Sequence, residues 1–230
     1  MQGPLVAESS QRLPNDDRAA AVRVPLYRRS PGRWLKPVVF ALAVVPLGLL
    51  VANVFSGSLG PNPVETLTDQ TGTLAIRFLL IGLALTPLRH LLGNTWPIRL
   101  RRMLGLFASF YLLLHIIVYA VLDRELDVAL VAEDLVERPY VMAGFVAFLI
   151  LLPLTLTSTK ALQRRLKQRW LALHRWVYVA CTAAVVHYVL LARGDRIEPY
   201  VYLAILGLLL AWRLQRTLTA ATAVKPAAGP

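Results

Sequence analysis

Six long apolar stretches, separated by short segments that carry most of the charge, limit the fold of this chain more than any other feature of its sequence. A helix that crosses a membrane needs about 20 mostly apolar residues, and each stretch comes close to that length. The chain is 57% hydrophobic and 17% charged, whereas soluble domains are about 45–50% apolar and about 25% charged. We therefore predict an all-α integral membrane protein, a bundle of six transmembrane helices, with spans near residues 35–55, 72–90, 103–122, 139–158, 170–192 and 199–215.

The predicted spans divide the chain into three parts. Residues 1–34 contain several arginines and prolines but no apolar run of the length found in a signal peptide. We expect them to form a mobile basic cytoplasmic tail, followed by a transmembrane domain over residues 35–217 and a short cytoplasmic tail over residues 218–230. The single cysteine, Cys181, excludes an intramolecular disulfide and a thiolate metal cluster.

The net charge of +12 follows the predicted spans. If residue 1 lies in the cytoplasm and each span crosses once, the cytoplasmic segments carry 20 of the 25 basic residues, and the opposite side carries 10 of the 13 acidic residues. Basic residues gather on the cytoplasmic side of membrane proteins. The charge thus predicts a multi-pass protein surrounded by membrane lipid, with both termini in the cytoplasm, and it does not indicate a nucleic-acid partner.

Two histidines fall inside predicted spans at matching depth, His115 on the third span and His187 on the fifth. At a rise of 1.5 Å per residue, they lie about 8–10 Å from the outer ends of their spans. Ionisable groups inside a bilayer are costly and mark functional sites by default, and two facing neutral imidazoles are suitable axial ligands for a haem iron. The pattern favours a bis-histidine haem near the outer face over a zinc site, which needs three or four ligands.

His174 precedes His187 by 13 residues, which separates the two by about 20 Å along one helix and leaves their rings about 140° apart around it. His174 would hold a second haem, orient a propionate or mediate electron entry from the cytoplasm, so the sequence predicts one or two b-type haems. The partner of a cytoplasmic-side haem stays open, because the position 14 residues before His115, on the same face of the third span, is Arg101 and not histidine.

Three arginines near predicted span ends are further candidates. The guanidinium groups of Arg77, Arg101 and Arg102 could pair with haem propionates, although topology and lipid phosphates explain the inner pair, Arg101 and Arg102, almost as well. His90 could supply a cytoplasmic ligand, but an interfacial histidine beside Arg89 is the simpler interpretation.

Two other classes of function remain open at this point. A proton-coupled small membrane transporter should show acidic partners in the spans or an inverted repeat, and the sequence shows neither. A non-redox structural membrane subunit would use the same histidines as hydrogen-bonding links between helices. The sequence contains no GxGxxG or Walker pattern and no hydrophilic region of nucleotide-binding size. A redox role would therefore be that of an electron conduit without catalytic residues of its own.

Several segments point to a known family. The most specific is TSTKALQRRLKQRWLALHRWVY at residues 157–178, and shorter ones are TG at 71–72, TPL at 86–88, RRMLGL at 101–106 and RPY at 138–140. Over about residues 35–217 the sequence resembles the MsrQ (YedZ) family of haem-binding membrane subunits, which belongs to the ferric-reductase-like transmembrane group. The long basic tail before Trp34 departs from the pattern of that family.

The resemblance implies a six-helix, ferric-reductase-like cytochrome b of the bacterial inner membrane, with His115, His174 and His187 as its haem-associated histidines. It implies that electrons arrive from the quinone pool or a cytoplasmic flavin reductase. The recipient would be MsrP, the periplasmic molybdopterin subunit of a protein-methionine-sulfoxide reductase system that repairs oxidised envelope proteins. Flavin mononucleotide (FMN) is also implied as a cofactor by the resemblance, and no residues of this sequence can be assigned to it.

Overall fold

A computed structural model describes residues 34–192 and 196–223 of the chain. These residues form nine α-helices and one π-helical turn and include no β-strand. Apart from Trp34, the predicted N-terminal tail lies outside the described residues, as do residues 224–230. The elements are α1 (Leu35–Phe55), α2 (Pro63–Leu92), α3 (Trp96–Ile117), η1 (Val118–Asp123), α4 (Val128–Glu137), α5 (Pro139–Leu156), α6 (Lys160–Leu166), α7 (Gln168–Arg175), α8 (Val177–Leu191) and α9 (Glu198–Ala223).

Five helices are long and apolar enough to cross a membrane: α1, α2, α3 continued by η1, α5 and α9. Helices α1 and α5 begin where the sequence predicts. Helix α2 begins nine residues before the predicted span, because Pro63 suits the first helical turn and Asn62 caps it by accepting a hydrogen bond from the Glu65 amide. Helix α9 continues to Ala223, six residues beyond the predicted end of the transmembrane domain.

The predicted fifth span, at residues 170–192, is not a single helix. It is divided at Trp176 into α7 and α8, and the Trp176 amide donates to the Leu173 carbonyl, three residues back instead of four. Helix α8 alone has 15 residues, or about 22 Å, which is shorter than a hydrocarbon core of about 30 Å. Six membrane-crossing helices are therefore not confirmed among the described residues, in which five qualify.

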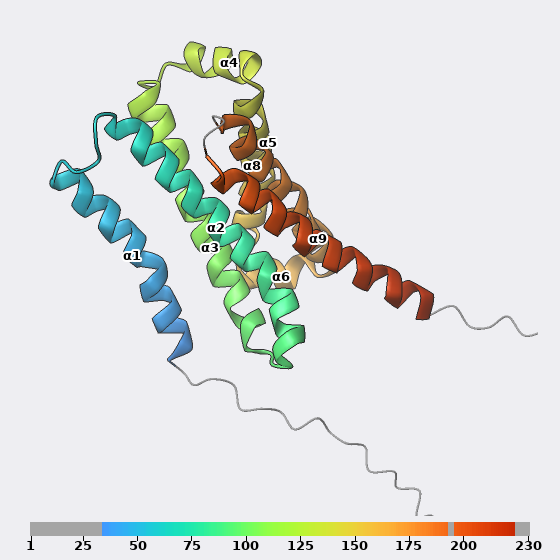
Figure 1. The fold of residues 1–230 in the computed structure, drawn as a ribbon. Coiled ribbons are helices and arrows are strands. Elements are labelled where there is room, and N and C mark those ends of the chain that lie inside the picture. Colours follow the sequence, from blue (N-terminus) through green and yellow to red (C-terminus); the bar gives the residue numbers. More distant parts are fainter. Residues whose placement is uncertain (1–33, 193–195, 224–230) are drawn as a thin grey trace, which may run out of the picture.

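The bundle is built from two helix pairs (Figure 1). Helix α2 packs along α3 and α5 packs along α8, while the two pairs meet each other at fewer positions. Helix α9 packs against α2 and α8, and α1 lies against α3, where the buried Tyr111 hydroxyl donates to the Ala43 carbonyl at 2.8 Å. Helix α4 lies at the end of the bundle where α2 and α5 begin, which we call the α4 end, and α6 lies toward the opposite end.

Helix α4 is held in place by a buried carboxylate. Asp134 is 5% exposed and accepts hydrogen bonds from the Tyr119 hydroxyl at 2.6 Å and from Arg124 Nε at 2.5 Å. Its other oxygen lies 3.0 Å from Arg138 Nε. Burial by itself would raise the pKa of Asp134, but the hydrogen bonds from Tyr119 and Arg124 hold that pKa below its ordinary value. The charged carboxylate thus ties α4 to η1 at neutral pH.

Candidate functional site

Helices from the two different pairs bring His115 and His187 together. His115 lies in the last turn of α3, just before η1, and His187 lies four residues before the end of α8. The ring centroids are 6.2 Å apart, and the ring planes meet at 77°. The matching depths in the sequence predict this meeting, and the structure places it toward the α4 end of the bundle.

Each ring is oriented by one backbone carbonyl. Nδ1 of His115 is 2.9 Å from the Thr68 carbonyl of α2, and Nδ1 of His187 is 2.6 Å from the Tyr140 carbonyl of α5. Because a carbonyl only accepts hydrogen bonds, Nδ1 carries the proton in both neutral rings. The lone pair of each imidazole is then on Nε2. A histidine held in this way presents Nε2 to a metal.

The spacing of the two rings fits one iron atom between them. A metal–imidazole bond is about 2 Å long, and a ring centroid lies roughly 1 Å beyond the bonded nitrogen, so two axial imidazoles on one iron have centroids roughly 6 Å apart. The described residues contain no group of three or more His, Cys, Asp or Glu side chains that could hold a bare metal ion. Two neutral imidazoles instead fit a cofactor such as haem, which brings the other ligands of its iron.

His174 lies apart from this pair, on α7. Its ring stacks on Trp170 with 3.9 Å between the centroids, and its Nδ1 is 3.1 Å from the Trp170 carbonyl. Nε2 of His174 is buried and has no hydrogen-bond partner among the described residues. Arg101 of α3 is half-buried. A buried ring nitrogen without a partner is costly, which makes His174 a second candidate position.

The other two candidate arginines have different surroundings. Arg77 lies in the middle of α2, because that helix begins earlier than predicted, and its Nε donates to the Tyr202 hydroxyl of α9 at 2.7 Å. The Tyr202 ring stacks on Tyr188 of α8, whose hydroxyl donates to Glu198 at 3.2 Å. Arg77 thus belongs to a series of hydrogen bonds and stacked rings that links α2, α8 and α9. Arg102 is exposed on α3.

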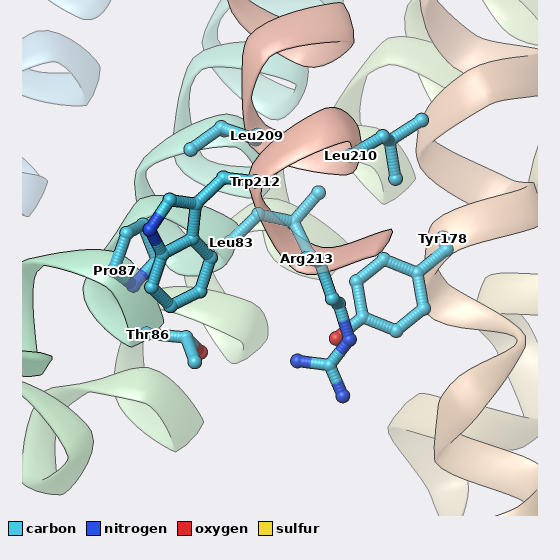
Figure 2. Close-up of a pocket in the computed structure, with 8 residues that line it drawn as sticks. All are labelled: Leu83, Thr86, Pro87, Tyr178, Leu209, Leu210, Trp212 and Arg213. Carbon is cyan, nitrogen blue, oxygen red and sulfur yellow. The ribbon is translucent and has the colours of Figure 1, made fainter. Parts of the chain in front are cut away.

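The His90 ring lies beside that of Trp212 of α9, with 5.5 Å between the ring centroids and 50° between the ring planes. Trp212 also lines a small pocket (Figure 2). The pocket has a volume of about 10 Å³, enough for about one water molecule and far too small for a haem. Pro87 has no amide hydrogen, so it cannot donate the helical hydrogen bond to the Leu83 carbonyl. Both residues line this pocket. Its lining consists of Leu83, Thr86, Pro87, Tyr178, Leu209, Leu210, Trp212 and Arg213.

The orienting carbonyls of Thr68 and Tyr140 were not predicted from the sequence. Every residue has a backbone carbonyl, so residue type gives no signal for such an acceptor. The structure shows that each carbonyl precedes its histidine by 47 residues.

Comparisons with known proteins identify the family of the chain. The family described as "Ferric reductase like transmembrane component" matches residues 71–185, a range that contains His115 and His174 and ends two residues before His187. The chain is 46% identical over 177 residues to the protein-methionine-sulfoxide reductase heme-binding subunit MsrQ of Rhodospirillum rubrum, covering 76% of this chain and 85% of that protein.

Further relatives carry the same name. The MsrQ subunit of Xanthomonas euvesicatoria is 43% identical over 191 residues, which cover 80% of this chain and 88% of the relative. The MsrQ subunit of Brucella anthropi is 38% identical over 186 residues, which cover 81% of this chain and 84% of the relative. No solved structure matches the chain. Its long apolar helices and the matched transmembrane family identify it as a membrane protein. From the extent of these matches, the chain belongs to the MsrQ family, within the ferric-reductase-like transmembrane group.

Proposed function

We propose that the chain is a b-type haem subunit that carries electrons across the bacterial inner membrane to MsrP, a periplasmic molybdopterin methionine sulfoxide reductase. The observation that carries the proposal is the pair formed by His115 and His187, whose Nδ1 hydrogen bonds leave the lone pair on Nε2 and whose 6.2 Å ring separation suits one iron. The names of the relatives, heme-binding subunits of a protein-methionine-sulfoxide reductase, support the same assignment. When bound, haem supplies reversible one-electron transfer.

The residues of the site have distinct tasks. His115 and His187 would hold the iron through Nε2, and the Thr68 and Tyr140 carbonyls keep Nδ1 protonated and fix the planes of the rings. If both histidines bound the iron, they would leave it no position for a substrate. The site therefore suits electron transfer, and chemistry on the sulfoxide belongs to the partner.

The electron count sets what the chain must deliver. Reduction of a methionine sulfoxide to methionine and water takes up two electrons and two protons, so the chain would pass two electrons, one at a time, for each sulfoxide. We propose the quinone pool or a cytoplasmic flavin reductase as their source. The proton uptake takes place at the partner. We assign no residues of this chain to FMN.

His174 supports a further contact with a cofactor, nearer the cytoplasmic side. Its buried Nε2 has no partner among the described residues, and a second haem or a propionate would provide one. A second bis-histidine haem would also need a ligand from α3, where Arg101 takes the expected place. Measuring haem per protein chain decides between one and two.

We propose that α7 and α8 together make the sixth membrane crossing and that both termini are cytoplasmic. Helix α8 packs along α5, one of the helices that qualify as spans, and α7 and α8 together cover residues 168–191. Those 24 positions correspond to about 36 Å of helix, enough for a hydrocarbon core. The α4 end, with its acidic residues, would then face the periplasm.

Cysteine labelling of intact cells tests this topology. With six crossings, a membrane-impermeant maleimide labels Ser58→Cys and Glu133→Cys at once, but labels Lys160→Cys and Thr217→Cys only after permeabilisation. Native Cys181 is fully buried and stays silent as the internal control. Because α9 follows α8 directly, five crossings without α7 and α8 would instead expose Thr217→Cys in intact cells.

Reduced-minus-oxidised absorption spectra of the purified protein test the proposed cofactor. Expression with haem supplied should give a b-type signal, and the pyridine haemochrome of the same sample should give one or two haems per chain. A transporter or a structural subunit would purify without that signal. A colourless preparation of folded protein would contradict the proposed function.

A further inference from the structure

We infer that Gly72 and Gly144 are positioning residues for the haem, because each keeps open the approach of a histidine ring to the carbonyl that orients it. This inference rests on the proposed haem site. It adds to the two histidines a second requirement, namely the absence of a side chain at two helical positions.

Both glycines stand in the same relation to an orienting carbonyl. Thr68 lies four residues before Gly72 on α2, and Tyr140 lies four residues before Gly144 on α5. In an α-helix the Cα–Cβ bond tilts toward the N-terminus, so the side chain at position i+4 lies over the carbonyl of residue i. The helical hydrogen bond occupies one lone pair of that carbonyl oxygen. Because glycine at i+4 has no side chain, the second lone pair stays accessible to the histidine ring.

Distances to the rings support this requirement. A Cβ atom added at Gly72 would lie 2.9 Å from Nδ1 of His115, and one added at Gly144 would lie 2.9 Å from Nδ1 of His187. Real Cβ atoms essentially never make contacts under 3.0 Å. A methyl group and the hydrogen-bonded ring therefore cannot both keep these positions.

Other helical glycines do not share this property. A Cβ atom added at Gly82 of α2 or at Gly105 of α3 would meet no atom within 4 Å. These two positions provide matched controls, since each lies on a helix of the same pair as Gly72 and His115. The close approach is thus a feature of Gly72 and Gly144 and not of glycine in this bundle.

In both helix pairs, the glycine and the orienting carbonyl stand at the same spacing from their histidine. In both helix pairs the glycine precedes its histidine by 43 residues and the carbonyl precedes it by 47 residues. Gly72 and Gly144 are 72 residues apart, as are His115 and His187. The same separation relates three further pairs of buried residues, Ala75 and Ala147, Leu79 and Leu151, and Ala108 and Ala180. Equivalent packing in two separate pairs indicates that the glycines meet a common steric need.

Alanine at either position should affect the haem-loaded protein more than the haem-free protein. Without an iron, the imidazole is the free end of a side chain and can turn away from a methyl group. With an iron bound, the ring is fixed. Alanine is also a better helix former than glycine, so the haem-free fold should tolerate it. The loss should fall on haem affinity and on the hydrogen bond at Nδ1.

The test compares the full-length variants Gly72→Ala and Gly144→Ala with the controls Gly82→Ala and Gly105→Ala. We expect the haem content of the site formed by His115 and His187 to fall about tenfold or more in the first two, in the range found when partners of metal ligands are removed. We also expect the midpoint potential of the remaining haem to rise, because a weaker Nδ1 hydrogen bond makes the imidazole a weaker donor to oxidised iron. The controls should keep wild-type haem content and potential, and all four should keep their helical circular dichroism.

Wild-type haem content and potential in Gly72→Ala and Gly144→Ala would overturn the inference while leaving the haem proposal intact. A wild-type protein without haem would instead overturn the proposed function. A measurement on unmodified protein covers the case in which the variants do not fold: electron–nuclear double resonance of the oxidised haem should detect a hydrogen-bonded, exchangeable Nδ1 proton on both axial rings. Absence of that proton from either ring would also overturn the inference.

Discussion

Replacing either His115 or His187 with alanine is expected to remove the low-spin b-type spectrum of one and the same haem. Each ring would supply one of the two axial nitrogens, and their centroids are only 6.2 Å apart. The haem content of that site should fall by more than about tenfold, because even the loss of a residue that supports a metal ligand costs that much. Reduced-minus-oxidised spectra, normalised to protein, provide the measurement.

Three further variants complete this experiment. The double variant, with both alanines, should lose no more signal than either single variant, because both ligands serve one haem. His90→Ala should keep the full spectrum, since His90 packs beside Trp212 away from this pair. His174→Ala should lower the haem content by about half if the chain holds two haems, and leave it unchanged if it holds one. A low-spin signal that persists in His115→Ala or His187→Ala would exclude that residue as an axial ligand.

Asp134→Ala is expected to loosen α4 while leaving the rest of the bundle in place. The substitution removes a carboxylate that is 5% exposed and accepts hydrogen bonds from Tyr119 and Arg124. Hydrogen bonds to charged groups contribute about 1.5–3 kcal/mol, and the two arginines left behind can be rehydrated at the surface. We therefore expect the local opening free energy of α4 to fall by about 2–3 kcal/mol.

Hydrogen exchange resolved by mass spectrometry measures this effect. Amides in residues 128–137 should exchange about 30- to 150-fold faster, and those of α2 and α3 should keep their wild-type rates. Glu133→Ala is the matched control, because Glu133 is the exposed neighbouring carboxylate on the same helix. Unchanged exchange in Asp134→Ala would contradict the role of this carboxylate in holding α4.

The same carboxylate gives a pH dependence with a definite sign. Because hydrogen bonds hold the pKa of folded Asp134 below the ordinary value of 3.8, its contribution is complete above that value and is lost as the pH falls through the lower, folded pKa. Asp134 should thus stay charged from pH 5 to 8 and should add no pH response to the amide hydrogen exchange of α4 in that range. Below about pH 4, wild-type α4 should open more readily, and Asp134→Asn should lack this added response.

Hydropathy was sufficient to predict the spans over 35–55 and 139–158, and the rise of a helix was sufficient to predict the shared depth of His115 and His187. Both are properties of the local sequence, because a bilayer selects length and apolarity and the rise per residue is constant. The same criterion could not detect the break at Trp176. The apolar stretch continues across that residue, whereas the break depends on which carbonyl its amide reaches.

The sequence by itself therefore determined the class of the protein, a helical membrane protein with two histidines at one depth. Only the tertiary structure decided that α2 and α5 present the Thr68 and Tyr140 carbonyls to those rings, and that Gly72 and Gly144 keep them accessible. The reason is physical. Depth along a helix follows from counting residues, but the facing of one helix toward another depends on packing across the whole bundle, to which residues more than 40 positions apart contribute.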